Sequence, residues 1–134
     1  MAAAVVLQQP IPGLKDSKKL TKKRREELAK TIEDEALAIG IGWVWPEAID
    51  SVGITQAVKI AMEDAVRQIE VPYDELIVDG NINYFADDPR ATALIKADDL
   101  IPAVSAASII AKVARDKYMT EVDVRYPGYG FAAH

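Results

Sequence analysis

The stretch Glu75-Leu76-Ile77-Val78-Asp79-Gly80-Asn81 decides the fold of this chain. A short apolar run that ends in a carboxylate and a glycine is typical of a buried parallel strand that delivers an acid to the edge of a sheet. Residues 91–98 repeat the pattern, because a second apolar run leads to Asp98. If the two strands are parallel neighbours, Asp79 and Asp98 lie at one edge, where open α/β sheets bind ligands. We therefore expect the two carboxylates to share a cation.

Composition narrows the class of protein. The chain has 134 residues, 50% of them hydrophobic, which predicts a single domain over residues 1–134 with a real core. It has no cysteine, so a disulfide framework and a thiolate metal site are excluded and a cytoplasmic protein is expected. Neither a signal peptide nor a membrane span is expected, because the apolar run within Met1 to Pro10 is too short.

Charge is distributed unevenly along the chain. The formal net charge of −5 argues against a uniformly basic nucleic-acid-binding protein. Basic residues nevertheless crowd near the start, at Lys15, Lys18, Lys19, Lys22, Lys23, Arg24 and Arg25. The last four open a predicted helix over 21–35 with Thr21 as its N-cap, where cations oppose the helix dipole. Two explanations stay open: a solvated helix face, or a basic surface held next to phosphates.

The remaining periodicities complete an α/β pattern. Strands are predicted over Ala2–Leu7 and Ala36–Trp45, and the glycines on one side of the second strand let another element pack closely. A helix over 54–69 is expected to bury Ile54, Val58, Ala61, Met62, Ala65 and Ile69. A long helix over 103–125 is expected to pack Ala107, Ile110, Ala111, Ala114 and Tyr118 on the sheet. This order of elements predicts a three-layer α/β domain with a mixed sheet.

The chemistry of the chain has to come from carboxylates. The sequence contains no phosphate-binding glycine loop, no His and Glu metal pair on a helix and no serine elbow. A pair of aspartates offers hard oxygen ligands, which suit Mg²⁺ or Mn²⁺ better than Zn²⁺. The alternative without a catalytic role is that Asp79 and Asp98 are solvated or cap turns.

Several motifs together resemble ribonuclease HII, in that family's order and spacing and over essentially the whole chain. They are Lys15-Asp16-Ser17-Lys18-Lys19-Leu20, Ile49-Asp50 with Ile54-Thr55-Gln56-Ala57, Ile77-Val78-Asp79-Gly80-Asn81, Lys96-Ala97-Asp98, the run from Ser105 to Asp116, and Tyr126-Pro127-Gly128-Tyr129-Gly130-Phe131 with His134. The resemblance implies a ribonuclease H-like three-layer fold with a mixed central sheet. It also implies an endonuclease, dependent on Mg²⁺ or Mn²⁺ and monomeric when complete, that acts in DNA replication and repair. Its substrates would be the RNA strand of RNA–DNA hybrids and single ribonucleotides embedded in duplex DNA.

The resemblance also assigns roles to individual residues. Asp79 and Asp98 match catalytic, metal-binding aspartates of the family, which hydrolyses the phosphodiester with two metal ions. Lys18, Lys19, Asn81 and Ser105 match positions close to the nucleic acid, where lysines neutralise phosphates and polar groups reach the backbone. The family pattern Lys-Gly-Asp is Lys96-Ala97-Asp98 here, so a positive φ at Ala97 would cost about 1 kcal/mol.

The ends of the chain depart from the family pattern. The family begins with a strand that ends in Asp-Glu and a Gly-Arg-Gly turn, and it continues beyond the stretch that matches His134 with a Lys-Gly-Tyr segment whose tyrosine helps recognise the ribose. We therefore expect a catalytic domain that lacks its first strand and is incomplete at both termini. One alternative is a non-catalytic remnant that binds the backbone of nucleic-acid duplexes. A receiver-like signalling domain is a further alternative, but that class needs an earlier strand that ends in acidic residues.

Overall fold

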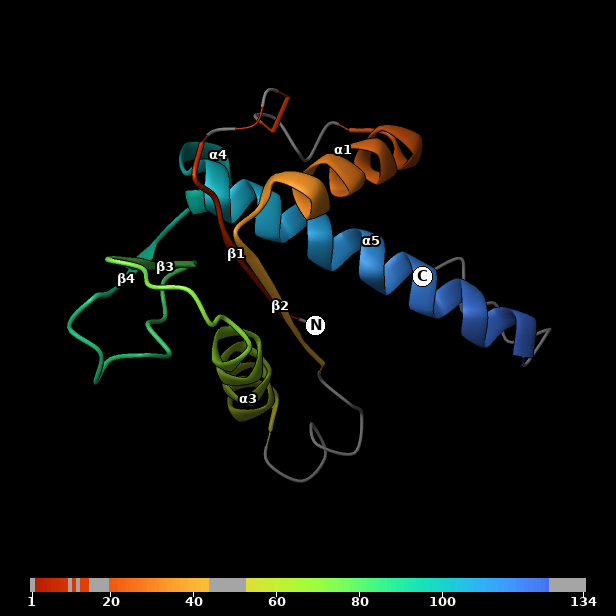
Figure 1. Ribbon diagram of the computed structural model, residues 1–134. Helices are drawn as coiled ribbons and strands as arrows, with labels where there is room; N and C mark the ends of the chain where they lie inside the picture. Colours follow the sequence, from red (N-terminus) through yellow and green to blue (C-terminus); the bar gives the residue numbers. More distant parts are fainter. Residues whose placement is uncertain (1, 10, 12, 15–19, 44–52, 126–134) are drawn as a thin grey trace.

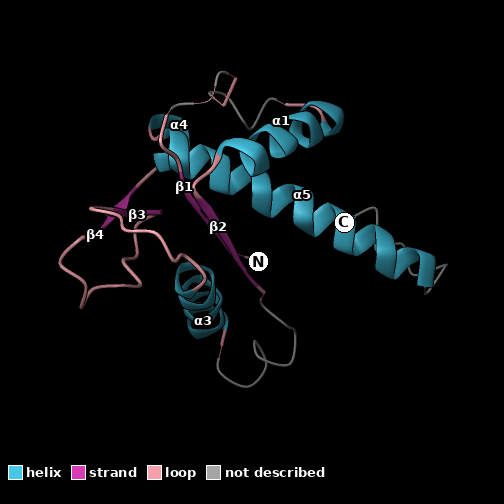
Figure 2. Cartoon of the chain, in the orientation of Figure 1, coloured by secondary structure: helices cyan, strands magenta, loops and turns pink. Residues whose placement is uncertain are grey.

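The computed structural model describes the chain except for residues 1, 10, 12, 15–19, 44–52 and 126–134. Figure 1 shows its strands and helices in chain order, and Figure 2 separates them by type. The elements are β1 (Ala2–Val6), α1 (Lys22–Glu35), β2 (Ala38–Gly42), α3 (Ile54–Arg67), β3 (Leu76–Asp79), β4 (Ala91–Leu94), α4 (Ala97–Leu100) and α5 (Pro102–Arg125). No helix among these residues is both long enough and apolar enough to span a bilayer.

The strands form two separate pairs. β1 runs antiparallel to β2, with Ala2 opposite Gly42 and Val6 opposite Ala38. β3 runs parallel to β4, with Leu76 opposite Ala91, as the apolar runs predicted. Both strand directions occur, but the predicted continuous mixed sheet is not found among the described residues, because β1 and β3 are not paired with each other. A groove lies between them instead.

Helices cover both faces of the β1–β2 pair. Ile39 and Ile41 of β2 pack against a core that includes Ile32 of α1 and Ile109 of α5. On the opposite face α3 lies so close to β2 that a Cβ atom at Gly40 would overlap the carbonyl oxygen of Ala65. The close approach predicted from the strand glycines is therefore confirmed, and α3 is the element that they admit.

Helix α1 follows its prediction closely. It begins after Thr21, whose Oγ1 accepts a hydrogen bond from the backbone N–H of Arg24 at 3.1 Å. Arg24 also pairs with Glu27 at 3.1 Å, and Arg25 reaches Asp116 of α5 at 3.5 Å. Because these two cations have carboxylate partners, part of the unfavourable placement at the helix start is offset within the protein.

Two predicted helix faces need correction. In α3 the buried residues are Ala57, Ala61 and Ala65, whereas Ile54 is 59% exposed. In α5 the most buried residues include Ala106 and Ile109, whereas the predicted core residues Ala107 and Ala111 are only partly buried and line the groove. The prediction assumed one continuous sheet beneath α5. The helix instead covers β1 and α1 with one face and turns the adjacent small residues toward the gap between the two strand pairs.

Candidate active site

Asp79 is the last residue of β3 and is exposed to solvent. The ladder continues for one residue beyond it, since the N–H of Gly80 donates to the carbonyl of Leu94 at 3.1 Å. Gly80 has φ 125°, a conformation that side chains rarely adopt, so the chain turns away directly after the carboxylate. The apolar run followed by Asp-Gly therefore places an acid at the carboxyl end of a parallel strand, as predicted.

Asp98 does not end a strand, and this corrects the prediction for residues 91–98. β4 ends at Leu94, and Lys96 then adopts a left-handed conformation with φ 58°. Asp98 follows in the first turn of α4 and is only 5% exposed. The positive φ expected at Ala97 falls on Lys96 instead, so an alanine at position 97 carries no such strain.

A hydrogen bond joins the two acidic segments. The backbone N–H of Ala97, the residue before Asp98, donates to Oδ1 of Asp79 at 3.0 Å. The left-handed Lys96 was not identified from the sequence. Its signal was the unusual Lys-Ala-Asp pattern, which pointed to backbone strain but at the neighbouring residue. The carboxylate of Asp79 is thus held at the turn that leads into Asp98.

The donor set fits a hard cation. Carboxylate oxygens suit Mg²⁺ or Mn²⁺, and Mg²⁺ is commonly held by one or two carboxylates with substrate phosphates and water completing its shell. Within the described part of the chain, no group of three or more His, Cys, Asp or Glu side chains could hold a metal ion. That Asp79 and Asp98 hold a cation therefore stays a prediction, and such a site would need further oxygen ligands.

Ser105 lies in the first turns of α5 and is 2% exposed. Its hydroxyl donates to the carbonyl of Leu14 at 2.6 Å. Leu14 is itself buried and directly precedes the basic stretch that contains Lys18 and Lys19, which lies outside the described residues. The observed contact of Ser105 is therefore structural, and its proximity to nucleic acid stays a prediction.

We expect Ser105→Ala to lower the free energy of unfolding by about 1–3 kcal/mol, because it leaves the buried carbonyl of Leu14 without its hydroxyl donor. Urea denaturation followed by circular dichroism measures the change. Ser108→Ala, on the same helix but only partly buried, is the matched control and should have a smaller effect. Equal midpoints for the two variants would contradict the role assigned to the hydroxyl.

The segment between β3 and β4 brings Asn81 to the same end of the strand pair. Asn81 is exposed and directly follows Gly80, so its side chain is accessible at the acidic edge, although a contact with nucleic acid stays a prediction.

Arg90, just before β4, holds the other end of this segment: its guanidinium contacts Asp88 at 2.9 Å and lies 4.4 Å from the centroid of the Tyr73 ring. The hydrogen bond from Arg90 lowers the pKa of Asp88 below its usual value. The contacts of Arg90 with Asp88 and Tyr73 were not predicted from the sequence.

Solved structures define the class of protein. The chain is similar to the ribonuclease H2 of Pyrococcus horikoshii OT3, at 28% identity and a TM-score of 0.73, over 88% of this chain and 62% of that one. It is likewise similar to the ribonuclease HII in the PCNA complex from Archaeoglobus fulgidus, at 30% identity and a TM-score of 0.74, over 91% of this chain and 65% of that one. The fold is therefore that of the ribonucleases H, as predicted.

The chain belongs to the ribonuclease HII family, whose family model matches residues 1–134. It is 50% identical to the ribonuclease HII of Laribacter hongkongensis over 99% of this chain and 69% of that protein. It is 48% identical to the ribonuclease HII of Shewanella amazonensis over 100% of this chain and 66% of that protein. The chain thus spans about two thirds of the length of these curated relatives.

Proposed function

We propose that this chain forms the central part of an endoribonuclease that cleaves the RNA strand of RNA–DNA hybrids and single ribonucleotides within duplex DNA. Membership of the ribonuclease HII family supports this proposal. The observation that carries it is the hydrogen bond from the backbone N–H of Ala97 to Asp79, which ties one family-matched aspartate to the residue before the other at one end of a parallel strand pair.

Each acidic side chain has a distinct task in this proposal. Asp79 is exposed and oriented by the N–H of Ala97, so it can face a phosphodiester from the solvent side. Asp98 is 5% exposed, so its position is fixed by its surroundings. Asp79 and Asp98 would hold a divalent cation, Mg²⁺ or Mn²⁺, which would supply positive charge to stabilise the developing charge on the phosphate. The finer proposal of two metal ions requires carboxylates beyond this pair.

The basic residues near the start would bind the backbone of the duplex. Lys18 and Lys19 would neutralise phosphates, and Asn81 would reach the sugar-phosphate backbone beside Asp79. Ser105 would act indirectly, because its hydroxyl fixes Leu14 at the beginning of the lysine-containing stretch. In this proposal the lysines would hold the duplex through its phosphates, and the carboxylates would act on the phosphodiester.

A non-catalytic duplex-binding role is the second candidate. It is favoured by the small number of acids at the edge, since the described residues hold no cluster of three or more metal-binding side chains. The two roles make the same prediction for backbone binding and opposite predictions for cleavage. Binding with salt dependence but without nicking, under conditions that supply every ligand, would favour the second role.

Metal binding tests the proposed site without relying on activity. We expect Mn²⁺ to broaden the NMR signals of residues around Gly80 and Ala97 before those elsewhere in the chain. Asp79→Asn should weaken this binding at least about tenfold, because it removes one of the two charged ligands. A titration of the labelled chain with Mn²⁺ measures both effects.

The matched control is Asp74→Asn, which removes an exposed carboxylate just before the opposite end of β3. Its Mn²⁺ affinity should equal that of the parent chain. Equal weakening in both variants would mean that Mn²⁺ responds to net charge alone, and the assignment of Asp79 as a ligand would then be wrong.

A further inference from the structure

The start of α1 carries two cations that no described carboxylate of the chain neutralises. Lys22 and Lys23 are exposed, and neither forms an ion pair within the described residues. The two arginines that follow them pair with carboxylates of α1 and α5 instead. Because the first turn contains no acidic residue, two positive charges stay at the helix end where the dipole disfavours them. Phosphates from a bound duplex would remove this cost.

Arg25 connects three segments through one guanidinium. Its Nη1 donates to the carbonyl of Leu20 at 3.1 Å, and its Nη2 lies 3.5 Å from Oδ2 of Asp116 in α5. The side chain of Arg25 is 22% exposed, against 50% for that of Arg24. A planar guanidinium holds both contacts at fixed angles, which the single ammonium of a lysine cannot do. Arg25 therefore fixes the backbone just before α1 onto α5.

The chain that leads to α1 is tied to the same helix at an earlier point. The hydroxyl of Ser105 donates to the carbonyl of Leu14 at 2.6 Å, so Leu14 and Leu20 are both connected to α5. The two attachment points, Ser105 and Asp116, lie about three helical turns apart. Helix α5 is thus a common support for the approach to α1 and for its first turn.

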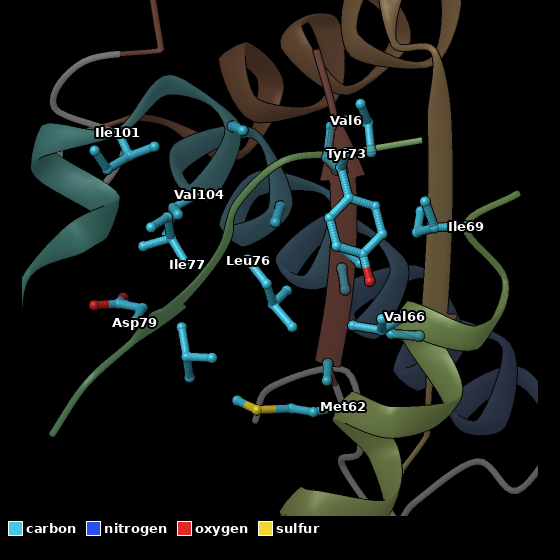
Figure 3. Close-up of a pocket in the computed structure, with 18 of the residues that line it drawn as sticks. Val6, Met62, Val66, Ile69, Tyr73, Leu76, Ile77, Asp79, Ile101 and Val104 are labelled. Carbon is cyan, nitrogen blue, oxygen red and sulfur yellow. The ribbon is translucent and has the colours of Figure 1, made fainter. Parts of the chain in front are cut away.

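Helix α5 also leads to the candidate active site. α4, which contains Asp98, directly precedes it, and the N–H of Ser105 donates to the carbonyl of Ile101 at the junction. Figure 3 shows Ile101 and Val104 on the same side of the groove between β1 and β3 as Asp79. A helix positions its residues more precisely than a loop does. The start of α1 is therefore held at a set distance from the acidic edge.

We propose that Lys22 and Lys23 bind phosphates of the duplex, at a distance from the candidate active site that α5 sets. The ion pair of Arg25 with Asp116 positions these lysines, because it holds the start of α1 against α5. Asp116 acts only through Arg25 and touches neither the duplex nor a metal ion. Cations that are already fixed lose less conformational freedom on binding, so the pair raises the affinity. This role rests on the duplex binding proposed above.

Asp116→Asn tests the positioning role, because charge and position have opposite effects on binding. Loss of a negative charge alone should strengthen binding to a duplex, whereas a loosened start of α1 should weaken it. We expect the full-length variant to bind an RNA–DNA hybrid at least about threefold more weakly than the parent chain. Fluorescence anisotropy measures the affinity, and urea denaturation measures the stability separately.

Two variants are matched controls for this substitution. Glu121→Gln removes an exposed acid of the same helix that makes no ion pair within the described residues, and it should bind as tightly as the parent or more tightly. Asp116→Glu keeps the charge that faces Arg25 and should bind as the parent does. If Asp116→Asn is less stable but its folded form binds the hybrid as tightly as the parent, the pair is only structural and the positioning role is overturned.

The lysines are tested by the salt dependence of binding. Replacing both Lys22 and Lys23 by glutamine should weaken binding and lower the slope of log affinity against log salt by about two, one for each phosphate contact. An unchanged slope would overturn their assignment alone. A parent chain that binds no hybrid at all would overturn the proposed function as well, so the two failures are distinguishable.

Discussion

The chain extended at its amino terminus by a strand ending in Asp-Glu and a Gly-Arg-Gly turn is expected to nick duplex DNA on the 5′ side of a single ribonucleotide, with Mg²⁺ or Mn²⁺. The 134-residue chain without this extension is expected not to cleave the duplex appreciably. Asp79 and Asp98 alone offer few anionic ligands, and Mg²⁺ gives up its water reluctantly. The added strand would lie beside β1 and bring two more carboxylates to the acidic edge.

Substitution of either aspartate tests this expectation. In the extended chain, Asp79→Asn and Asp98→Asn should each lower the cleavage rate at least about a hundredfold, since a cation worth several kcal/mol of transition-state stabilisation loses a ligand. Asp99→Asn, an exposed neighbour of Asp98, is the matched control. Gel analysis of an end-labelled duplex gives the rates. A folded extended chain that binds the duplex but never cuts it with either metal would refute the catalytic assignment.

Gly40→Ala is expected to destabilise the chain by at least about 2–3 kcal/mol, a large part of the stability of a small domain. The new Cβ would overlap the backbone carbonyl of Ala65 in α3. A backbone atom within a helix cannot move aside as the end of a flexible side chain can. Relief therefore requires α3 to shift away from β2, which loses contacts along the whole interface.

Urea denaturation of Gly40→Ala should show a lower midpoint with an unchanged slope. Ile39→Val is the matched control, because it alters the adjacent residue on the opposite face and should cost only about 0.5–1.5 kcal/mol. If the two variants unfold at the same midpoint, the close approach of α3 to β2 does not limit the size of residue 40.

The features predicted correctly from the sequence are those that depend on neighbouring residues in the chain. The polar cap at Thr21, the alternation of isoleucine with glycine in β2 and the apolar run into Asp79 each reflect one residue's immediate neighbours, and each appears in the structure. The position of Asp79 at the carboxyl end of a strand could be predicted, because an apolar run followed by Asp-Gly is typical of such a strand end. The repeat of this pattern in residues 91–98 paired Asp79 with Asp98, and the family resemblance then implied a metal-binding role for both.

Other features depend on partners that no local pattern reveals. The separation into two strand pairs depends on which strand edges meet, and the incomplete burial of Ala107 and Ala111 follows from that separation. The four-residue α4 has no periodicity to detect, so Asp98 was assigned to a strand end. The hydrogen bond of the Ser105 hydroxyl was not predicted, because its acceptor, the carbonyl of Leu14, lies 91 residues earlier in the chain.

The side chain of Gln68 gives the β1–β2 pair two unlike sides. Its amide makes the two hydrogen bonds that the backbone of a neighbouring strand would make: it accepts from the N–H of Ile41 at 3.0 Å and donates to the carbonyl of Ile41 at 2.7 Å. A fibril of stacked strands grows only when every added unit presents a fresh edge for the next. Association through β1 would leave Gln68 on the outer side of each partner. Association through β1 would therefore stop at a pair, because the next strand would find the Ile41 position of β2 already hydrogen-bonded to Gln68.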